Sequence, residues 1–112
     1  MSAQDDRTRI QDMLDAARKI VLFTQNTKRQ TFVQDEILQL AVVRLIEIVG
    51  EAASRISLAV QTAHPEIPWA AMIGMRNRLI HAYFSVDLDR VWETATISMP
   101  ALIAQLEQLT SE

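Results

Sequence analysis

The chain has 112 residues and a mass of 12.7 kDa, which fits one domain spanning residues 1–112 and leaves no room for separate catalytic and regulatory modules. It is 49% apolar and 22% charged, as globular proteins are, and its two glycines and three prolines are too few for a sheet of many short strands, so we expect an all-α fold. The net charge of −3 argues against a protein that coats nucleic acid with a broad basic face, and the absence of cysteine excludes disulfides and thiolate zinc sites. Without a signal-peptide pattern or an apolar run of about 18 residues, we expect a soluble, cytoplasmic protein with no membrane contact.

The first predicted element is an amphipathic helix from about Asp5 to Gln25. Apolar residues recur along it at helical spacing, at Ile10, Leu14, Ala17 and Val21. The polar stretch 25–30 ends this helix.

A second predicted helix runs from Thr31 to about Val60, since Thr31 and Gln34 have the spacing of a capping box. This helix is apolar around too much of its circumference for packing on one side only, so it is either central in the bundle or also buried against a second chain. Gly50, in its middle, indicates the close approach of another backbone. These two features predict a homodimer.

A charged ridge follows the same helix at spacings of three, four and four residues: Arg44, Glu47, Glu51 and Arg55. Glu51 and Arg55 form a favourable pair one turn apart. A solvated face is the favoured interpretation. The alternative is that these charges line a site, which makes Glu47 and Glu51 candidate site-lining residues.

A stiff loop, residues 64–68, precedes a third predicted helix from Trp69 to about Phe84, with Pro68 suited to its first turn. Asp87 is a good cap for a fourth helix, which Pro100 should kink or split because it cannot bond to the Thr96 carbonyl. The expected architecture is an up-and-down bundle of four helices, the last one broken at Pro100.

The third helix carries the chain's one dense polar cluster, within a window from Glu66 to Asp87 that has no acid between its ends. At about 100° per residue, Asn77 and His81 share one face, and Arg76 and Tyr83 align on a neighbouring one. The four offer a base that titrates near neutrality, a permanent cation, a carboxamide and a phenol, and Arg78 adds a candidate site-lining cation. This set suits the binding and attack of a phosphodiester.

No metal-ligand set and no cofactor motif accompany the cluster. Asp87, Asp89 and Glu93 are better explained as the cap and exposed first turn of a helix. Judged on its residues alone, the cluster also fits a structural role, because one arginine and one histidine five residues apart form a weak pattern.

Several segments resemble one family. The string from Arg76 to Tyr83 is similar to the Arg-x4-His-x-Tyr motif of HEPN-domain ribonucleases, in particular the HepT-like toxins. Residues 44–52 resemble the Gly-Glu-Ala segment of that family's long second helix, and residues 67–69 and 74–77 resemble its approach to the motif. The resemblance covers most of residues 30–105.

The resemblance implies a HEPN-like bundle and a homodimeric, metal-independent endoribonuclease toxin of a toxin–antitoxin pair, with two motif helices forming a composite site across the dimer. In this hypothesis His81 is the base toward the ribose 2′-hydroxyl, Arg76 stabilises the phosphate charge, and Asn77 orients the substrate or His81. The implied partner is a minimal nucleotidyltransferase antitoxin that uses ATP to adenylylate Tyr83. The alternative is a non-catalytic helical module that holds a nucleotide or partners a nucleotidyltransferase.

Overall fold

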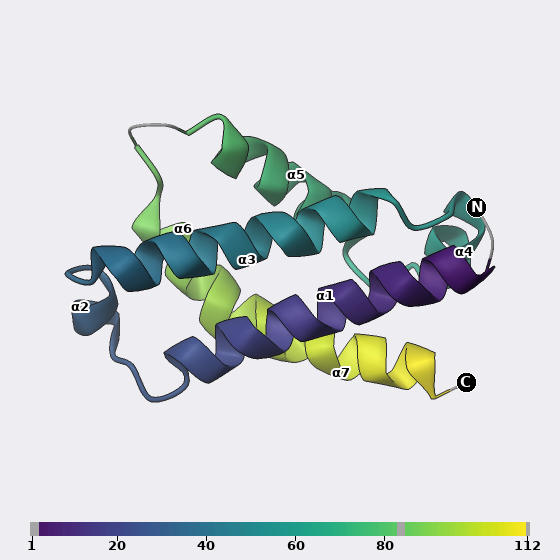
Figure 1. The fold of residues 1–112 in the computed structure, drawn as a ribbon, viewed down its shortest axis with the longest axis horizontal. Helices are drawn as coiled ribbons and strands as arrows, with labels where there is room; N and C mark the ends of the chain where they lie inside the picture. The colour runs from purple at the N-terminus through teal and green to yellow at the C-terminus, as the bar shows by residue number, and fades with distance from the viewer. Residues whose placement is uncertain (1–2, 83–84, 112) are drawn as a thin grey trace.

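Every regular element in the computed structural model, which describes residues 3–82 and 85–111, is a helix (Figure 1). The all-α prediction is therefore confirmed. In chain order the elements are α1 (Ala3–Thr24), α2 (Arg29–Phe32), α3 (Glu36–Ser54), α4 (Leu58–Ala63), α5 (Trp69–Ile80), α6 (Leu88–Glu93), a π-helical turn η1 (Thr94–Ser98) and α7 (Met99–Thr110). Within the described residues, no helix combines the length and the apolar character that crossing a membrane requires.

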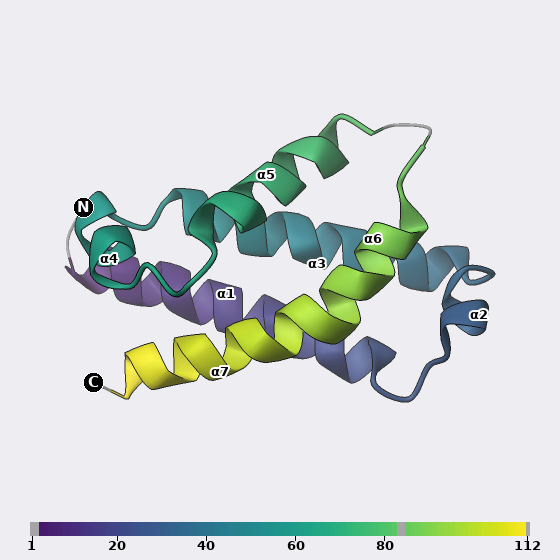
Figure 2. The ribbon, with the colours of Figure 1, turned by 180° about the vertical axis from the view of Figure 1, so that it is seen from behind.

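The helix α3 is the centre of the bundle. A central position was one of the two explanations expected for its all-round apolar surface. It packs most extensively against α1 and α5, and α1 also packs against α7. Figures 1 and 2 show α1 and α3 side by side and antiparallel, while α5 crosses α3 obliquely. Central position thus explains most of the apolar circumference of α3 within one chain.

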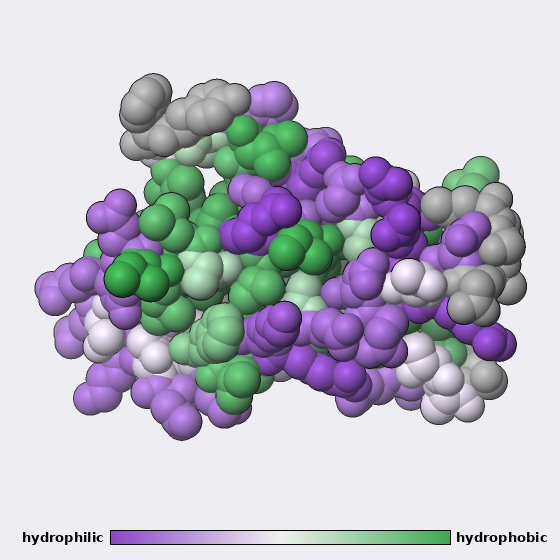
Figure 3. Space-filling view, in the orientation of Figure 1, coloured by the Kyte–Doolittle hydropathy of each residue, from purple (hydrophilic) through white to green (hydrophobic). Residues whose placement is uncertain are grey.

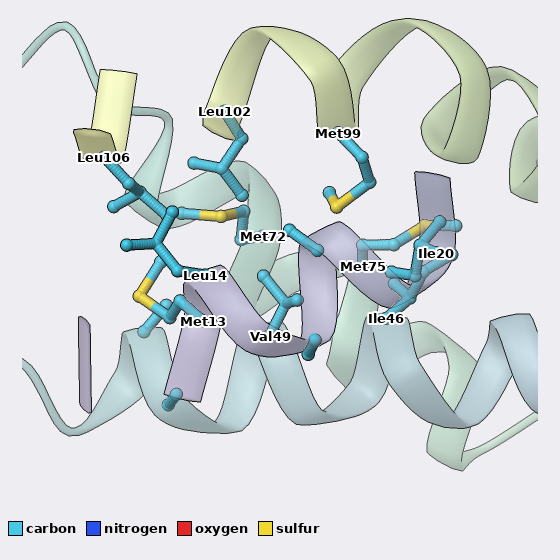
Figure 4. Packing of buried hydrophobic residues seen from close by; sticks show 14 of the residues in the cluster. Met13, Leu14, Ile20, Ile46, Val49, Met72, Met75, Met99, Leu102 and Leu106 are labelled. Atoms are coloured by element: carbon cyan, nitrogen blue, oxygen red, sulfur yellow. The ribbon is translucent and has the colours of Figure 1, made fainter. Parts of the chain in front are cut away.

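The hydrophobic core lies between α1, α3, α5 and α7 (Figure 4). Residues such as Met13, Ile20, Val42 and Leu106 have no exposed side-chain surface. Burying a side chain of this size contributes roughly 1.5–3 kcal/mol, so the core holds the helices in place.

The prediction of one second helix from Thr31 to Val60 was wrong, and so was the count of four helices. Thr31 lies inside the short α2, and the cap of α3 is Asp35, whose Oδ1 accepts from the Leu38 N–H at 3.0 Å. At the other end, Ser57 begins α4, because its hydroxyl accepts from the Val60 N–H. The buried Asp6 carboxylate also accepts from the Ser57 N–H at 2.9 Å and from its hydroxyl at 2.8 Å, a long-range contact that sequence periodicity cannot reveal.

The last two predicted helices are also partly corrected. Asp87 caps α6 as expected, accepting from the Arg90 N–H at 3.2 Å. The irregularity expected at Pro100 is the π-helical turn just before it, where the chain bends between α6 and α7 without a helix end (Figure 2). Proline has no N–H for the Thr96 carbonyl, so the regular bonding pattern cannot continue through this turn.

Candidate active site

The motif helix α5 lies directly on α3 at Gly50. A Cβ atom built on Gly50 would stand 2.3 Å from the Cβ of Arg76 and 2.7 Å from the carbonyl oxygen of Met72. The close backbone approach predicted from Gly50 is therefore confirmed, but the approaching backbone belongs to the same chain. Gly50 consequently gives no support to the predicted homodimer, and it sets the position of Arg76 instead.

Arg76 is held by both branches of its guanidinium. Its Nη2 donates to the Glu51 carboxylate at 2.6 Å, and its Nη1 donates to the Asn77 side-chain oxygen at 2.8 Å. The Arg76 side chain keeps 29% of its surface exposed. The Arg76 guanidinium is therefore held in a fixed orientation and can still be reached by an anion. A group that stabilises a developing phosphate charge needs both properties.

Glu51 connects two arginines. Its Oε2 accepts from Arg76, while its Oε1 accepts from the Arg55 Nε at 3.0 Å. The hydrogen bond from Arg55 lowers the pKa of Glu51, burial opposes this, and the charge of Arg76 lowers the pKa further. The carboxylate therefore stays ionised at neutral pH. Glu51 contacts the motif arginine, so the solvated-face interpretation is incomplete at this position of the ridge.

Glu47 is close to its expected position but has a different partner. Its carboxylate pairs with Arg44 at 3.4 Å and is mostly buried, whereas the Arg44 side chain is largely exposed. Glu47 thus lies on the same face of α3 as Glu51, one turn nearer the N-terminus.

His81 stands at the end of α5. The predicted helix to about Phe84 was too long: α5 ends at Ile80, His81 is the capping position, and the Ala82 N–H bonds to the Leu79 carbonyl in a tightened last turn. His81 is exposed, and within the described residues its imidazole makes no hydrogen bond or ion pair. The side chain that the motif offers as a base therefore lies open to a substrate.

Arg78 does not join this group in the structure. Arg78 points its guanidinium at the Met75 sulfur, 3.8 Å away, and lines a separate cavity of about 610 Å³ between α5 and the α6–α7 segment. Tyr83 lies outside the described residues.

Two acidic residues around α6 have structural partners. Asp87 caps the helix, and Asp89 forms an ion pair with Arg29 that ties α2 to α6. Across residues 3–82 and 85–111, no three His, Cys, Asp or Glu side chains are grouped so as to hold a metal ion.

Arg55 is the residue that sequence reasoning did not connect with the motif. Its pairing with Glu51 was visible as a spacing of four, but the contact between Glu51 and Arg76 joins two helices. The signal available in the sequence was Gly50, because a glycine inside a helix marks the close approach of another backbone. The structure thus extends the candidate site from α5 onto α3.

Comparisons with known proteins point to one family. A family model described as "Ribonuclease HepT-like" matches residues 13–109. The chain is 40% identical to a probable ribonuclease HepT of Thermococcus cleftensis over 100 residues, which cover 89% of this chain and 91% of that protein. It is 34% identical to a candidate RNase of Methanocaldococcus jannaschii over 112 residues, covering 100% of this chain and 93% of the relative. No solved structure matches the chain at a significant level.

Proposed function

The chain belongs to the HepT-like ribonuclease family, and from this premise we propose that it is a metal-independent endoribonuclease whose site is built from Arg76, Asn77 and His81. The observation that carries the proposal is the arrangement at the end of α5. There a fixed, partly exposed guanidinium is held by Glu51 and Asn77, and an open imidazole follows five residues later. This combination supplies a base and an anion-stabilising group, the two functions that internal RNA transesterification requires.

The reaction proceeds by attack of the ribose 2′-oxygen on the neighbouring phosphorus. His81 takes the 2′-hydroxyl proton, the bond from phosphorus to the 2′-oxygen forms, and the bond to the 5′-oxygen breaks. The leaving 5′-oxygen takes a proton from water, and His81 gives its proton back to water. Arg76 stabilises the charge on the phosphate oxygens, and Asn77 keeps the Arg76 fork in its orientation. Glu51 is a positioning residue, because it touches Arg76 and not the substrate. The products are a 2′,3′-cyclic phosphate and a 5′-hydroxyl end.

The purified chain should cut total RNA in the presence of a chelator, since the base and the cation are both side chains. A synthetic RNA with a single 2′-deoxy nucleotide at a mapped cleavage position should resist cutting there and be cut elsewhere. Gel analysis and end-group mapping measure both results. Efficient cutting of DNA, or complete loss of activity with chelator, would contradict the mechanism, and RNA binding without any cleavage would favour the non-catalytic module.

The enzyme acts as a homodimer with a composite site across the interface. Support comes from apolar side chains left uncovered on α3, where Ile37 is 82% and Leu40 63% exposed. Figure 3 shows hydrophobic side chains gathered over the N-terminal half of α3, beside the region where α3 meets α5. A second copy seated there would bury this patch and bring a second motif helix near the first.

Sedimentation at micromolar concentration should accordingly give twice the chain mass of 12.7 kDa. Replacing the two exposed residues together, Ile37→Lys with Leu40→Lys, should shift the mass toward that of one chain without loss of helicity. A monomer in the unsubstituted protein would remove the basis for a composite site.

The enzyme is the toxin of a toxin–antitoxin pair, and a nucleotidyltransferase antitoxin with ATP silences it by transferring AMP to Tyr83. The support is Tyr83's place two residues after His81 in a motif that resembles the family's. An adenylyl group there would add bulk and negative charge near Arg76 and repel an incoming phosphate.

Intact-mass spectrometry after co-expression with such a partner should show added AMP units that disappear in Tyr83→Phe. The modified protein should have lost cleavage, and phosphodiesterase removal of AMP should restore it. The same additions on Tyr83→Phe, or full activity in the modified protein, would refute this regulation.

A further inference from the structure

The ion-pair group around Glu51 contains more positive than negative charge. One carboxylate serves two guanidiniums, from Arg76 on α5 and from Arg55 on α3. The bonds from Ser57 to Asp6 place the first turns of α1 beside the end of α3, where the charge of Arg9 also acts on Glu51. Arg9 has its own partner in Asp12 at 3.4 Å, so the excess of positive charge comes from Arg55 and Arg76. In a chain with a net charge of −3, this is a local surplus of positive charge next to the motif.

Most N–H donors of the Arg55 guanidinium are not used by its bond to Glu51. Its side chain is 54% exposed, and the bond to Glu51 engages only Nε. A guanidinium has five N–H donors, so the four N–H donors on the two Nη groups are not used by that bond. Within the described part of the chain, no other ion pair of Arg55 accompanies it.

We propose that Arg55 is a second phosphate-binding residue, which holds the RNA backbone next to the phosphate that Arg76 stabilises. This inference rests on the proposed ribonuclease function and adds a residue to its substrate-binding surface. Glu51 bonds Arg76 through one oxygen and Arg55 through the other, so the two guanidiniums stand on either side of a single carboxylate. Because the phosphates of a strand are regularly spaced, an RNA with one phosphate at Arg76 can place a neighbouring phosphate at Arg55.

A surface ion pair within one helix contributes little to the stability of the protein. If the Glu51–Arg55 pair had only that role, removing Arg55 would leave RNA binding unchanged. Figure 3 shows hydrophilic side chains gathered where the C-terminal half of α3 meets α5, as a surface that binds a phosphate backbone requires.

The test measures RNA affinity against salt in the full chain carrying His81→Ala, so that the RNA stays intact. Anisotropy of a fluorescein-labelled, 12-nucleotide single-stranded RNA is followed from 50 to 300 mM KCl. Adding Arg55→Gln should weaken binding and reduce the slope of log Kd against log salt by about 0.7 for each Arg55 that contacts phosphate. Arg55→Lys should keep the slope, because it keeps the charge while losing the Nε bond to Glu51.

The matched control is Arg18→Gln. Arg18 also pairs with a glutamate at 3.0 Å and is similarly exposed, at 47%, but it joins α1 to Glu107 on α7, away from α5. This variant should retain the full slope. An unchanged slope in Arg55→Gln, or an equal decrease in Arg18→Gln, overturns the inference. If the unsubstituted protein still cuts RNA in that case, the ribonuclease proposal stands; if it neither binds nor cuts RNA, the ribonuclease proposal itself fails.

Discussion

His81→Ala should lower the rate of RNA cleavage by about 100- to 10,000-fold, the usual contribution of a positioned general base. Because His81 is exposed and follows the last residue of α5, its loss should leave helicity, thermal stability and oligomeric mass unchanged. Single-turnover cleavage of a labelled RNA, with circular dichroism beside it, measures both. Arg76→Ala should lower the cleavage rate by a comparable factor. Arg76→Lys should recover little of that rate, since a lysine lacks the planar guanidinium that bonds Glu51 and Asn77 at the same time.

The control for His81 is the chain's other histidine. His64 lies between α4 and α5, where its ring pairs with Glu66 at 3.4 Å and its carbonyl accepts from the Trp69 indole N–H at 2.9 Å. His64→Ala should cleave RNA at the unsubstituted rate. Full activity in His81→Ala, or an equal loss in His64→Ala, would show that the base has been assigned to the wrong residue.

Gly50→Ala should destabilise the protein although alanine is the better helix former. The added methyl would gain up to about 1 kcal/mol in helix propensity. It would, however, overlap the Cβ of Arg76 and the carbonyl of Met72, and neither atom can rotate away because each belongs to or adjoins the backbone of α5. Overpacking of this kind costs about 1–3 kcal/mol, so α5 should move off α3. Arg76 moves with it, and cleavage should fall with stability.

Gly74 provides the matched control on α5. A Cβ there would meet only the Arg78 guanidinium, at 3.7 Å, an ordinary contact with a mobile side chain. Gly74→Ala should therefore raise stability by about 0.5–1 kcal/mol. Thermal unfolding by circular dichroism should move the two variants in opposite directions, by roughly 4–8 °C for each kcal/mol. Equal stabilisation of both would mean that α5 does not press on α3 at Gly50.

Local patterns predicted the elements that depend on local forces. The spacing of apolar residues located α1, and the Asp87 cap located the start of α6, because both effects act within one or two turns of the chain. The same reasoning failed between Thr31 and Val60. There the periodicity continues across the ends of α3, and the breaks come from Asp35 and from the contact of Ser57 with Asp6, 51 positions away.

The candidate site also has a part that the sequence predicted and a part that only the structure shows. Motif resemblance identified Arg76, Asn77 and His81, which lie within six residues of one another along the chain. The partner of Arg76 was out of reach, since Glu51 belongs to a different helix and its ridge has the spacing of an ordinary solvated face.

The sequence by itself determined that this protein is helical and belongs among HepT-like ribonucleases, and it predicted that most candidate site residues lie close together on one helix, because composition, periodicity and motif spacing are all properties of neighbouring residues. Only the tertiary structure decided where that helix lies and what its arginine touches. The reason is the contact at Gly50: the absence of one side chain lets α5 press onto α3, and that approach brings Arg76 to a carboxylate it shares with Arg55.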